Sequence, residues 1–356
     1  MSHYTDMKTN VKAEYRLDVN PAVLAKMRSS GAGLALNTHR ALARDILSAG
    51  SPEMAASIST EHVYHQKYWV RTTRGMPWDA MLGYRARNIL SMRGDGITEP
   101  VELFFDDKGC VYYHGYHRLA TALELGLQSM PVKAYVLGDA LHDLSQRLFS
   151  IYKGEFTHTL YQPVAHPFFR LFPVQLANSM WEQKVAAVQK AVRSWEGEIV
   201  EVGAHFGMLT RALRNAGIDI RATDCSQFYV DIQSLFEGIG LEPVPYEQQS
   251  IQALAQQERP VWLVIMGLMH HLVGKPDLWT TMEATVLPWM ERCVQGMVVE
   301  MSLLDHYLKK DAAVTVTSDA DVDVFWRRYG FTSQRLVEGS MRRVTYLVLP
   351  VKKERK

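Results

Sequence analysis

Two carboxylates and two glycines between residues 198 and 224 have the types and spacing needed to bind a nucleoside-containing cofactor. In EIVEVGAHFGMLTRALRNAGIDIRATD, Glu201 precedes Gly203, Gly207 follows, and Asp224 stands 21 positions after Gly203. Glycine allows a sharp turn and a close approach of backbone to ligand. In α/β nucleotide-binding units, an acid about 20 residues after the first glycine reaches the ribose hydroxyls. The pattern therefore predicts a cofactor loop followed by a ribose-binding carboxylate.

The position two residues after Gly203 is His205, so the dinucleotide fingerprint G-x-G-x-x-G is absent. The acidic-x-Gly-x-x-x-Gly pattern resembles motif I of class I S-adenosylmethionine-dependent methyltransferases, in the form VGAxxG. The resemblance covers about residues 180–350. It implies S-adenosylmethionine as cofactor, with contacts from Glu201, Gly203, Ala204, His205, Gly207, Asp224, Cys225, Gln249, Ser250 and Met266. The alternative is an α/β domain without a cofactor, in which the glycines only permit close packing.

Three further residues are candidates for catalysis in a methyltransferase. His270 and His271 follow the apolar segment VWLVIMG, and Glu300 ends the apolar segment at 294–301. Imidazole titrates near neutrality, so either histidine is a candidate general base that deprotonates the methyl acceptor. The alternatives are a capping or packing role for the histidines and an ion pair with a basic neighbour for Glu300.

Strands and helices alternate through the second half of the chain. Apolar runs predict strands at 198–203, 219–223, 242–246, 261–267 and 294–301, with helices between them and another helix at 319–329. The end, FTSQRLVEGSMRRVTYLVLP, predicts two antiparallel strands. The predicted fold class is α/β: a Rossmann-like seven-stranded sheet with a terminal hairpin over residues 181–356, opened by a helix at Trp181–Trp195.

A second motif, CVYYHGYHRLATALELG, combines a strand end with a helix start. The N-terminus of the helix, an imidazole and a guanidinium converge at Gly115, Tyr116, His117 and Arg118, which predicts an anion site. With a helix at 78–92 and strands at 101–107, 110–115 and 131–137, this region resembles the ParB/sulfiredoxin superfamily over about residues 78–137. The resemblance implies an α+β domain whose G-x-H-R turn binds the phosphates of ATP or CTP with magnesium.

Sulfiredoxin redox chemistry is not expected, because Tyr116 stands where those proteins carry a reactive cysteine. The alternative to phosphate binding is that His117 and Arg118 pair with carboxylates such as Asp106 or Glu124.

The predicted domain organisation has four parts. Residues 1–75 form a helical extension, with helices at 21–29, 38–48 and 52–65 and a frayed segment at 1–16. The ParB/sulfiredoxin-like domain spans 76–153, with a closing helix at 139–153, and a connection spans 154–180. The aromatic residues of this connection, such as Tyr161, Phe168 and Phe169, are expected to pack at an interface, with a substrate cleft as the alternative.

Composition excludes several classes of protein. Lys+Arg 39 against Asp+Glu 38 leaves a net charge of +1, so no global field favours nucleic acid or an anionic membrane. Three scattered cysteines do not predict a disulfide framework or a thiolate metal site. With no apolar run near the length of a membrane span and no signal-peptide pattern, a cytoplasmic protein is expected.

Three functional hypotheses follow. The first is a methyltransferase acting on a small-molecule or nucleotide-linked substrate, with the N-terminal domain binding a phosphate or nucleotide. The second is a kinase-like or bifunctional enzyme that uses a nucleoside triphosphate. The third is a non-catalytic sensor of nucleotide or S-adenosylmethionine. Domain analogy alone does not choose among them.

Overall fold

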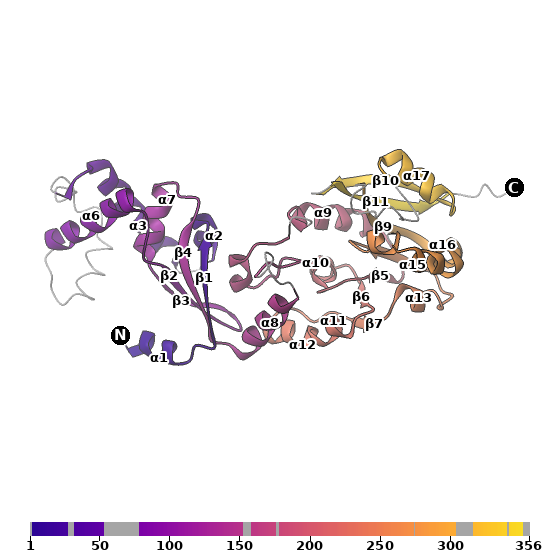
Figure 1. The fold of residues 1–356 in the computed structure, drawn as a ribbon, viewed down its shortest axis with the longest axis horizontal. Coiled ribbons are helices and arrows are strands. Elements are labelled where there is room, and N and C mark those ends of the chain that lie inside the picture. The colour runs from indigo at the N-terminus through magenta and orange to yellow at the C-terminus, as the bar shows by residue number, and fades with distance from the viewer. Residues whose placement is uncertain are drawn as a thin grey trace. The chain divides into compact units, whose positions relative to one another are not determined.

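The computed structural model describes residues 2–27, 32–52, 78–151, 158–175, 178–273, 275–303, 316–339 and 342–351. The chain divides into two compact units (Figure 1). Unit 1 comprises Met1–Arg147 and Ala165–Phe172, and unit 2 comprises Leu148–Val164 and Pro173–Lys356. The helix predicted at 52–65 lies almost wholly outside the described residues. Among those residues, every helix is too short or too polar to cross a membrane.

Unit 1 is built on a four-stranded sheet in the order β1-β4-β2-β3. Strands β1 and β4 are antiparallel, β4 and β2 parallel, and β2 and β3 antiparallel. The strands are β1 (Ala13–Val19), β2 (Val101–Asp106), β3 (Gly109–His114) and β4 (Met130–Val136). The helices are α1 (Ser2–Thr9), α2 (Pro21–Lys26), α3 (Ala32–Ala49), α6 (Trp78–Asp95), α7 (Tyr116–Glu124) and α8 (Asp139–Ser150), with the 3-10 helix η2 (Pro167–Leu171).

The first residues of the chain correct the predicted helical extension. Residues 13–19, expected partly in a frayed segment, form strand β1 and pair along their whole length with β4. Only Tyr15 and Val19 of this strand are buried, because one face of an edge strand packs on the core while the other meets solvent. The charged residues between them obscure the strand in the sequence, and its pairing partner lies more than 100 positions away.

The segment predicted as an inter-domain connection contributes to the core of unit 1. Helix η2 buries Phe168 and Phe169 completely or almost so. The Phe168 ring makes edge contacts with Tyr15 at 5.3 Å and Phe105 at 5.4 Å between centroids. Burying a phenylalanine side chain contributes about 1.5–3 kcal/mol. These residues therefore stabilise unit 1, and the boundary between the units does not follow the linear order of the chain.

Unit 2 contains a seven-stranded sheet in the order β10-β11-β9-β8-β5-β6-β7. Its strands are parallel except β11, which runs antiparallel to both β9 and β10. The strands are β5 (Ile199–Val202), β6 (Arg221–Asp224), β7 (Tyr246–Gln248), β8 (Val261–Ile265), β9 (Val294–Ser302), β10 (Phe331–Glu338) and β11 (Arg343–Pro350). The predicted alternation of strands and helices, the five parallel strands and the closing hairpin are confirmed. The third strand lies later than the predicted 242–246, because Pro243 and Pro245 have no N–H to donate to a neighbouring strand.

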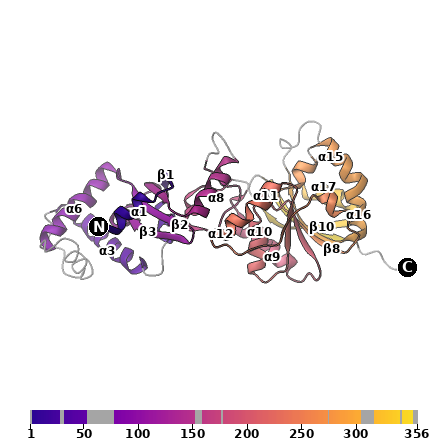
Figure 2. The same ribbon diagram turned by 90° about the horizontal axis from the view of Figure 1, so that it is seen from below.

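Helices cover both faces of this sheet (Figure 2). Successive strand residues point to opposite faces, so Val200 joins one hydrophobic cluster and Ile199 the other. The larger cluster packs against α13 (Ile251–Leu254), α14 (Met269–Val273), α15 (Pro276–Thr281), the π-helix η4 (Met282–Val286), α16 (Leu287–Cys293) and α17 (Asp319–Arg327). The other packs against α9 (Trp181–Val192) and α10 (Met208–Asn215), while α11 (Gln227–Asp231) and α12 (Gln233–Gly238) follow β6.

The strand order reverses at the centre of the sheet. The chain runs from β5 outward to β6 and β7, then returns to β8 on the other side of β5. Ligands of open α/β sheets bind where the strand order reverses, at the carboxyl ends of the strands. In unit 2 this point lies between β5 and β8, immediately beside Gly203.

Candidate functional site

The loop after β5 is held in a conformation that requires glycine. Gly203 and Gly207 both have φ near +69°, in the left-handed region. A Cβ on Gly203 would lie 3.1 Å from the Leu268 side chain, and a Cβ on Gly207 would lie 3.2 Å from the Tyr246 ring. The left-handed Gly207 is the N-cap of α10. The backbone conformation and the close neighbours therefore explain why both positions require glycine.

Glu201 lies one residue before the end of β5, with its carboxylate buried beside the start of α10. Its Oε2 accepts hydrogen bonds from the backbone N–H and the hydroxyl of Thr210, at 2.9 and 2.5 Å. Burial raises the pKa of Glu201 to about 7, because it disfavours the charged form more than the two hydrogen bonds from Thr210 favour it. Near neutral pH this carboxylate is therefore only partly ionised, and a cationic group beside it would favour its charged form.

Asp224 ends the neighbouring strand β6. Its two oxygens accept hydrogen bonds from the backbone N–H groups of His205, at 3.2 Å, and Ser226, at 3.0 Å. The carboxylate is thus tied to the glycine loop of β5, and its remaining lone pairs are open to further donors. Ala204 in the same loop is buried and donates its N–H to Thr223, which keeps the loop against β6.

His205 has an unusual backbone and a neutral ring. Its φ of +55° is in the left-handed region, which is uncommon for a residue other than glycine. The imidazole lies between the rings of Tyr161 and Tyr229, each at a centroid distance of 4.2 Å. Burial lowers the pKa of His205 to about 3, so the ring is uncharged at neutral pH.

Three other residues predicted to contact the cofactor follow strands β6 and β7. Gln249 accepts a hydrogen bond from Arg221 at 3.3 Å, and its backbone N–H donates to the carbonyl of Asp224. Ser250 is the N-cap of α13 and accepts from the N–H of Ala253 at 3.1 Å. Cys225 is exposed at the end of β6, and partial burial next to Asp224 raises the pKa of its thiol.

Two cations and a carboxylate meet beyond the carboxyl end of β8. Glu300, on β9, is 2.5 Å from the Lys184 ammonium through Oε2 and 3.3 Å from Arg343 Nη1 through Oε1. The ion pair that the sequence left open for Glu300 is therefore present. A Cβ on Gly267, whose φ is +67°, would lie 2.9 Å from the Tyr161 hydroxyl, 3.7 Å from Arg343 Nη1 and 4.0 Å from Glu300 Oε1. These polar groups converge on one point.

Of the two histidines predicted as general bases, the structure describes the side chain of one. The His270 side chain lies outside the described part of the structure. His271 is exposed in the middle of α14, and partial burial together with the nearby cations Lys275 and Arg343 lowers its pKa. A lowered pKa keeps this imidazole neutral at physiological pH, which is the form that a general base requires.

A small cavity of about 20 Å³ lies between Glu201 of β5 and Glu300 of β9. Met266, Glu201 and Glu300 line it together with Tyr161 and Gln162. The polar groups fit S-adenosylmethionine, because carboxylates that can accept hydrogen bonds lie near the ends of two neighbouring strands, before and after a left-handed glycine loop. The volume does not fit, since ligand pockets commonly measure about 300–1,000 Å³. Side chains that line the cavity, such as Tyr161, must move to admit such a cofactor.

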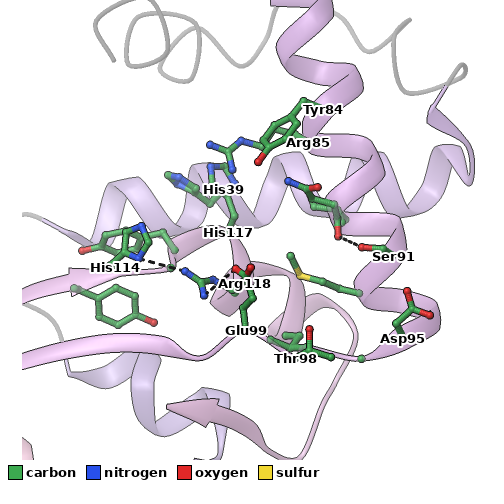
Figure 3. Close-up of a pocket in the computed structure, with 18 of the residues that line it drawn as sticks. His39, Tyr84, Arg85, Ser91, Asp95, Thr98, Glu99, His114, His117 and Arg118 are labelled. Carbon is green, nitrogen blue, oxygen red and sulfur yellow. Dashed lines mark hydrogen bonds and ion pairs between the residues drawn. The ribbon is translucent and has the colours of Figure 1, made fainter. Parts of the chain in front are cut away.

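Unit 1 holds a larger cavity, of about 810 Å³, at the start of α7 (Figure 3). Gly115 begins this helix with φ of +116°, and a Cβ there would lie 3.1 Å from Val101 and 3.2 Å from Arg118. Gly115, Tyr116, His117 and Arg118 all line the cavity, as do residues of α6 and β3. The four residues predicted to form an anion site thus share one hollow.

The cavity also contains basic residues that the sequence motif did not include. His39, on α3, lies with its ring 4.2 Å from the His117 ring. Figure 3 shows the Arg85 side chain, from α6, directed toward the same two histidines. No spacing rule connects His39 or Arg85 with the G-x-H-R turn, because three separate helices bring these residues together.

Arg118 makes contacts other than the predicted ones. Its Nη1 donates to the Pro100 carbonyl at 2.5 Å and lies 3.5 Å from Glu99, and its Nη2 is 3.3 Å from His114 Nδ1. The carboxylates named as alternative partners are engaged elsewhere. Glu124 pairs with two arginines of α3, and Asp106 accepts from the backbone of the β2–β3 turn. Tyr116 stacks on Tyr113 at 4.6 Å.

No protein-family model and no curated protein matches the sequence. Among solved structures, a magnesium protoporphyrin IX methyltransferase from Synechocystis PCC 6803 with bound S-adenosylmethionine is 15% identical, covers 48% of this chain and 80% of that chain, and has a TM-score of 0.35. A Bacteroides fragilis S-adenosylmethionine-dependent methyltransferase in complex with S-adenosylhomocysteine is 16% identical, with 46% and 77% coverage and a TM-score of 0.33. The bifunctional kinase-methyltransferase WbdD is 14% identical, covers 58% of this chain and 46% of that chain, and has a TM-score of 0.43.

Proposed function

We propose that unit 2 is an S-adenosylmethionine-dependent methyltransferase domain. The observation that carries the proposal is the pair of buried carboxylates, Glu201 and Asp224, at the ends of adjacent strands around the left-handed loop Gly203–Gly207. This arrangement lies at the point where the strand order reverses, which is where open α/β sheets bind ligands. The residues support binding of a molecule that carries both an ammonium group and a ribose diol.

In this proposal, the residues at the carboxyl ends of β5 and β6 bind different parts of the cofactor. Glu201 binds the amino group of the cofactor, the loop from Gly203 to Gly207 lies along its methionine and ribose, and Asp224 accepts hydrogen bonds from the ribose hydroxyls. S-adenosylmethionine, when bound, supplies a methyl group already activated on a sulfonium. The protein then needs mainly to hold the acceptor in line and to exclude water, and we assign His271 as the base that accepts the proton of the acceptor.

Calorimetric titration with S-adenosylhomocysteine tests this function. We expect wild-type protein to bind it and Asp224→Ala to bind it about 10- to 100-fold more weakly, the cost of losing hydrogen bonds to a charged acceptor. Asp219→Ala is a matched control, because Asp219 precedes the same strand at its opposite end and its side chain is 98% exposed. Equal affinities for wild type and Asp224→Ala would show that the ribose assignment is incorrect.

We also propose that unit 1 binds a phosphate, carried by a nucleotide or by a nucleotide-linked substrate. Support comes from the 810 Å³ cavity, which opens on the N-terminus of α7 and gathers His39, Arg85, His117 and Arg118. Cationic side chains and the positive end of a helix together favour an anion. Nucleotide recognition of the kind found in the ParB/sulfiredoxin superfamily is the specific form that we propose.

Titration with ATP and with CTP, each with magnesium, tests this second assignment. We expect micromolar to millimolar binding that His117→Ala weakens by about tenfold or more. Arg16→Ala is the control, because Arg16 is an exposed arginine of β1 away from the cavity. Binding with no hydrolysis indicates a recognition module, whereas magnesium-dependent hydrolysis lost in His117→Ala would favour a kinase-like activity. Absence of binding to either nucleotide would refute the assignment.

A further inference from the structure

The side chain of Tyr161 lies across the point where the strand order of unit 2 reverses. Its ring packs on the ring of His205, in the loop after β5, at a centroid distance of 4.2 Å. Its hydroxyl reaches the loop after β8, where it lies 2.9 Å from the position that a Cβ on Gly267 would occupy. These two loops border the region in which an open α/β sheet binds its ligand. One tyrosine therefore spans the proposed cofactor site from one side to the other.

The space that remains beside Tyr161 is the size of a single small group. The cavity that it lines with Glu201 and Met266 measures about 20 Å³. A water molecule needs about 10–15 Å³ of such space, whereas sites for small-molecule ligands commonly measure about 300–1,000 Å³. The methionine part of a cofactor held by Glu201 and the glycine loop would need the space that the Tyr161 ring occupies. Binding of that part of the cofactor therefore requires a movement of this side chain.

Hydrogen bonds hold the backbone of this segment, so the movement falls to the side chain. The N–H of Leu160 donates to the Pro173 carbonyl at 2.9 Å, and its carbonyl accepts from the N–H of Gln175 at 2.8 Å. The Tyr161 carbonyl accepts from the Asn178 side chain at 2.5 Å. A rotation about the Cα–Cβ bond of Tyr161 leaves all three hydrogen bonds intact and carries the ring to another staggered position.

The stack on His205 holds the ring of Tyr161 in place, but its surroundings also contain unfavourable features. Nδ1 of His205 is buried without a hydrogen-bond partner among the described residues, and the same holds for Oε1 of Gln162. A buried polar atom without a partner costs free energy, and so does the left-handed backbone of His205, with φ of +55°. Water or a ligand that takes the place of the Tyr161 ring can satisfy such atoms. A side chain held by stacking and opposed by these costs is expected to have a second position.

We propose that Tyr161 is the gate of the cofactor site: stacked on His205 it closes the space between the loops after β5 and β8, and it rotates away when the cofactor binds. This inference rests on the proposed methyltransferase function. Only molecules with an open gate bind, so the closed position lowers the apparent affinity by the fraction that is open. In the proposed site the adenosine part of the cofactor lies at β6, on the far side of β5 from β8. Binding of adenosine therefore does not require the gate to open.

The binding of S-adenosylhomocysteine and of adenosine to Tyr161→Ala tests the gate. Surface plasmon resonance measures the association rate and the affinity of both ligands for the full chain. One pair of packed aromatic rings corresponds to a change of about 2- to 10-fold in an equilibrium constant. We therefore expect Tyr161→Ala to bind S-adenosylhomocysteine about 2- to 10-fold faster and more tightly than wild type does. Adenosine should bind both proteins equally, because it does not occupy the space of the Tyr161 ring.

Three further variants make the test specific to the ring. Tyr161→Phe keeps the ring and should match wild type, whereas Tyr161→Leu removes the stack, keeps an apolar side chain and should match Tyr161→Ala. Tyr329→Ala is the control, because Tyr329 is a tyrosine partly buried elsewhere in unit 2, and it should leave the binding of both ligands unchanged. Circular dichroism and the melting temperature establish that each variant folds. A general loosening of unit 2 would change adenosine binding as well, which the gate does not predict.

Several outcomes would overturn the gate. One is unchanged or slower association of S-adenosylhomocysteine with Tyr161→Ala and Tyr161→Leu, while binding to wild type still supports the methyltransferase function. A second is an equal acceleration for adenosine, because the ring would then not act on the methionine part. A third is that Tyr161→Phe accelerates binding as much as Tyr161→Ala, which would show that the stack does not close the site. If neither wild type nor Tyr161→Ala binds S-adenosylhomocysteine or adenosine, the proposed function itself fails, and the gate fails with it.

Discussion

The buried carboxyl group of Glu201 should make the stability of unit 2 depend on pH in a particular direction. Burial raises its pKa from 4.5 to about 7, so the folded protein binds a proton that the unfolded chain has released between these two values. Stability from this group is complete below pH 4.5 and is lost as the pH rises through 7. At 1.36 kcal/mol per pKa unit, the loss amounts to about 3 kcal/mol.

Substitution of Glu201 by glutamine should abolish this dependence, because the amide does not ionise and can still accept from Thr210. The free energy of unfolding of Glu201→Gln minus that of wild type should rise by about 3 kcal/mol between pH 4.5 and 7.5. Urea unfolding followed by the fluorescence of the buried Trp289 and Trp326 measures this difference in unit 2. Other titrating groups cancel in the subtraction.

A surface carboxylate provides the control for this experiment. Glu258 is 73% exposed and forms a surface ion pair with Arg292, so Glu258→Gln should change the free energy of unfolding by less than about 1 kcal/mol. A flat difference for Glu201→Gln would refute the argument that desolvation dominates at this site. A difference that falls with pH would mean that the ionised form is the more stable one in the folded protein.

Three further predictions concern single side chains. Phe168→Ala should destabilise unit 1 by about 3–5 kcal/mol in urea unfolding, because the ring is fully buried; a cost under about 1 kcal/mol would contradict its placement in the core. Gly207→Ala should cost about 1–2 kcal/mol and weaken S-adenosylhomocysteine binding, since its φ is +69° and the Tyr246 ring leaves only 3.2 Å. The NMR signal of the His205 ring should not titrate between pH 8 and 4, because its pKa is lowered to about 3; a midpoint near 6.5 would mean that the ring is exposed to water.

The alternation of strands and helices in unit 2 was predictable because it depends on local patterns. Apolar runs, glycines at helix ends and the Glu-Gly-Ser turn each act within about ten residues, and the seven-stranded sheet follows from their order. The sequence also places Glu201 and Asp224 at strand ends, where parallel strands bring them to the same edge. The role of these residues in cofactor binding remains a prediction.

Strand β1 and helix η2 could not be predicted in the same way. The β1 strand has only two buried residues, and its stability comes from pairing with β4 near residue 133. Phe168 and Phe169 are aromatic residues in a proline-rich segment, and nothing nearby indicates that they belong to the core of unit 1. Such contacts are determined by burial against distant residues and override the local signal.

The sequence by itself determined the α/β class, the terminal hairpin, the glycine loop with its two acids and the helix that begins at Gly115. Only the tertiary structure decided which side chains meet. It placed His39 beside His117 in unit 1, and in unit 2 it joined Lys184 and Arg343 to Glu300. The physical reason is that a charge or ring can be matched only by groups within a few ångströms, and residues 43 to 116 positions apart come that close only when the chain folds.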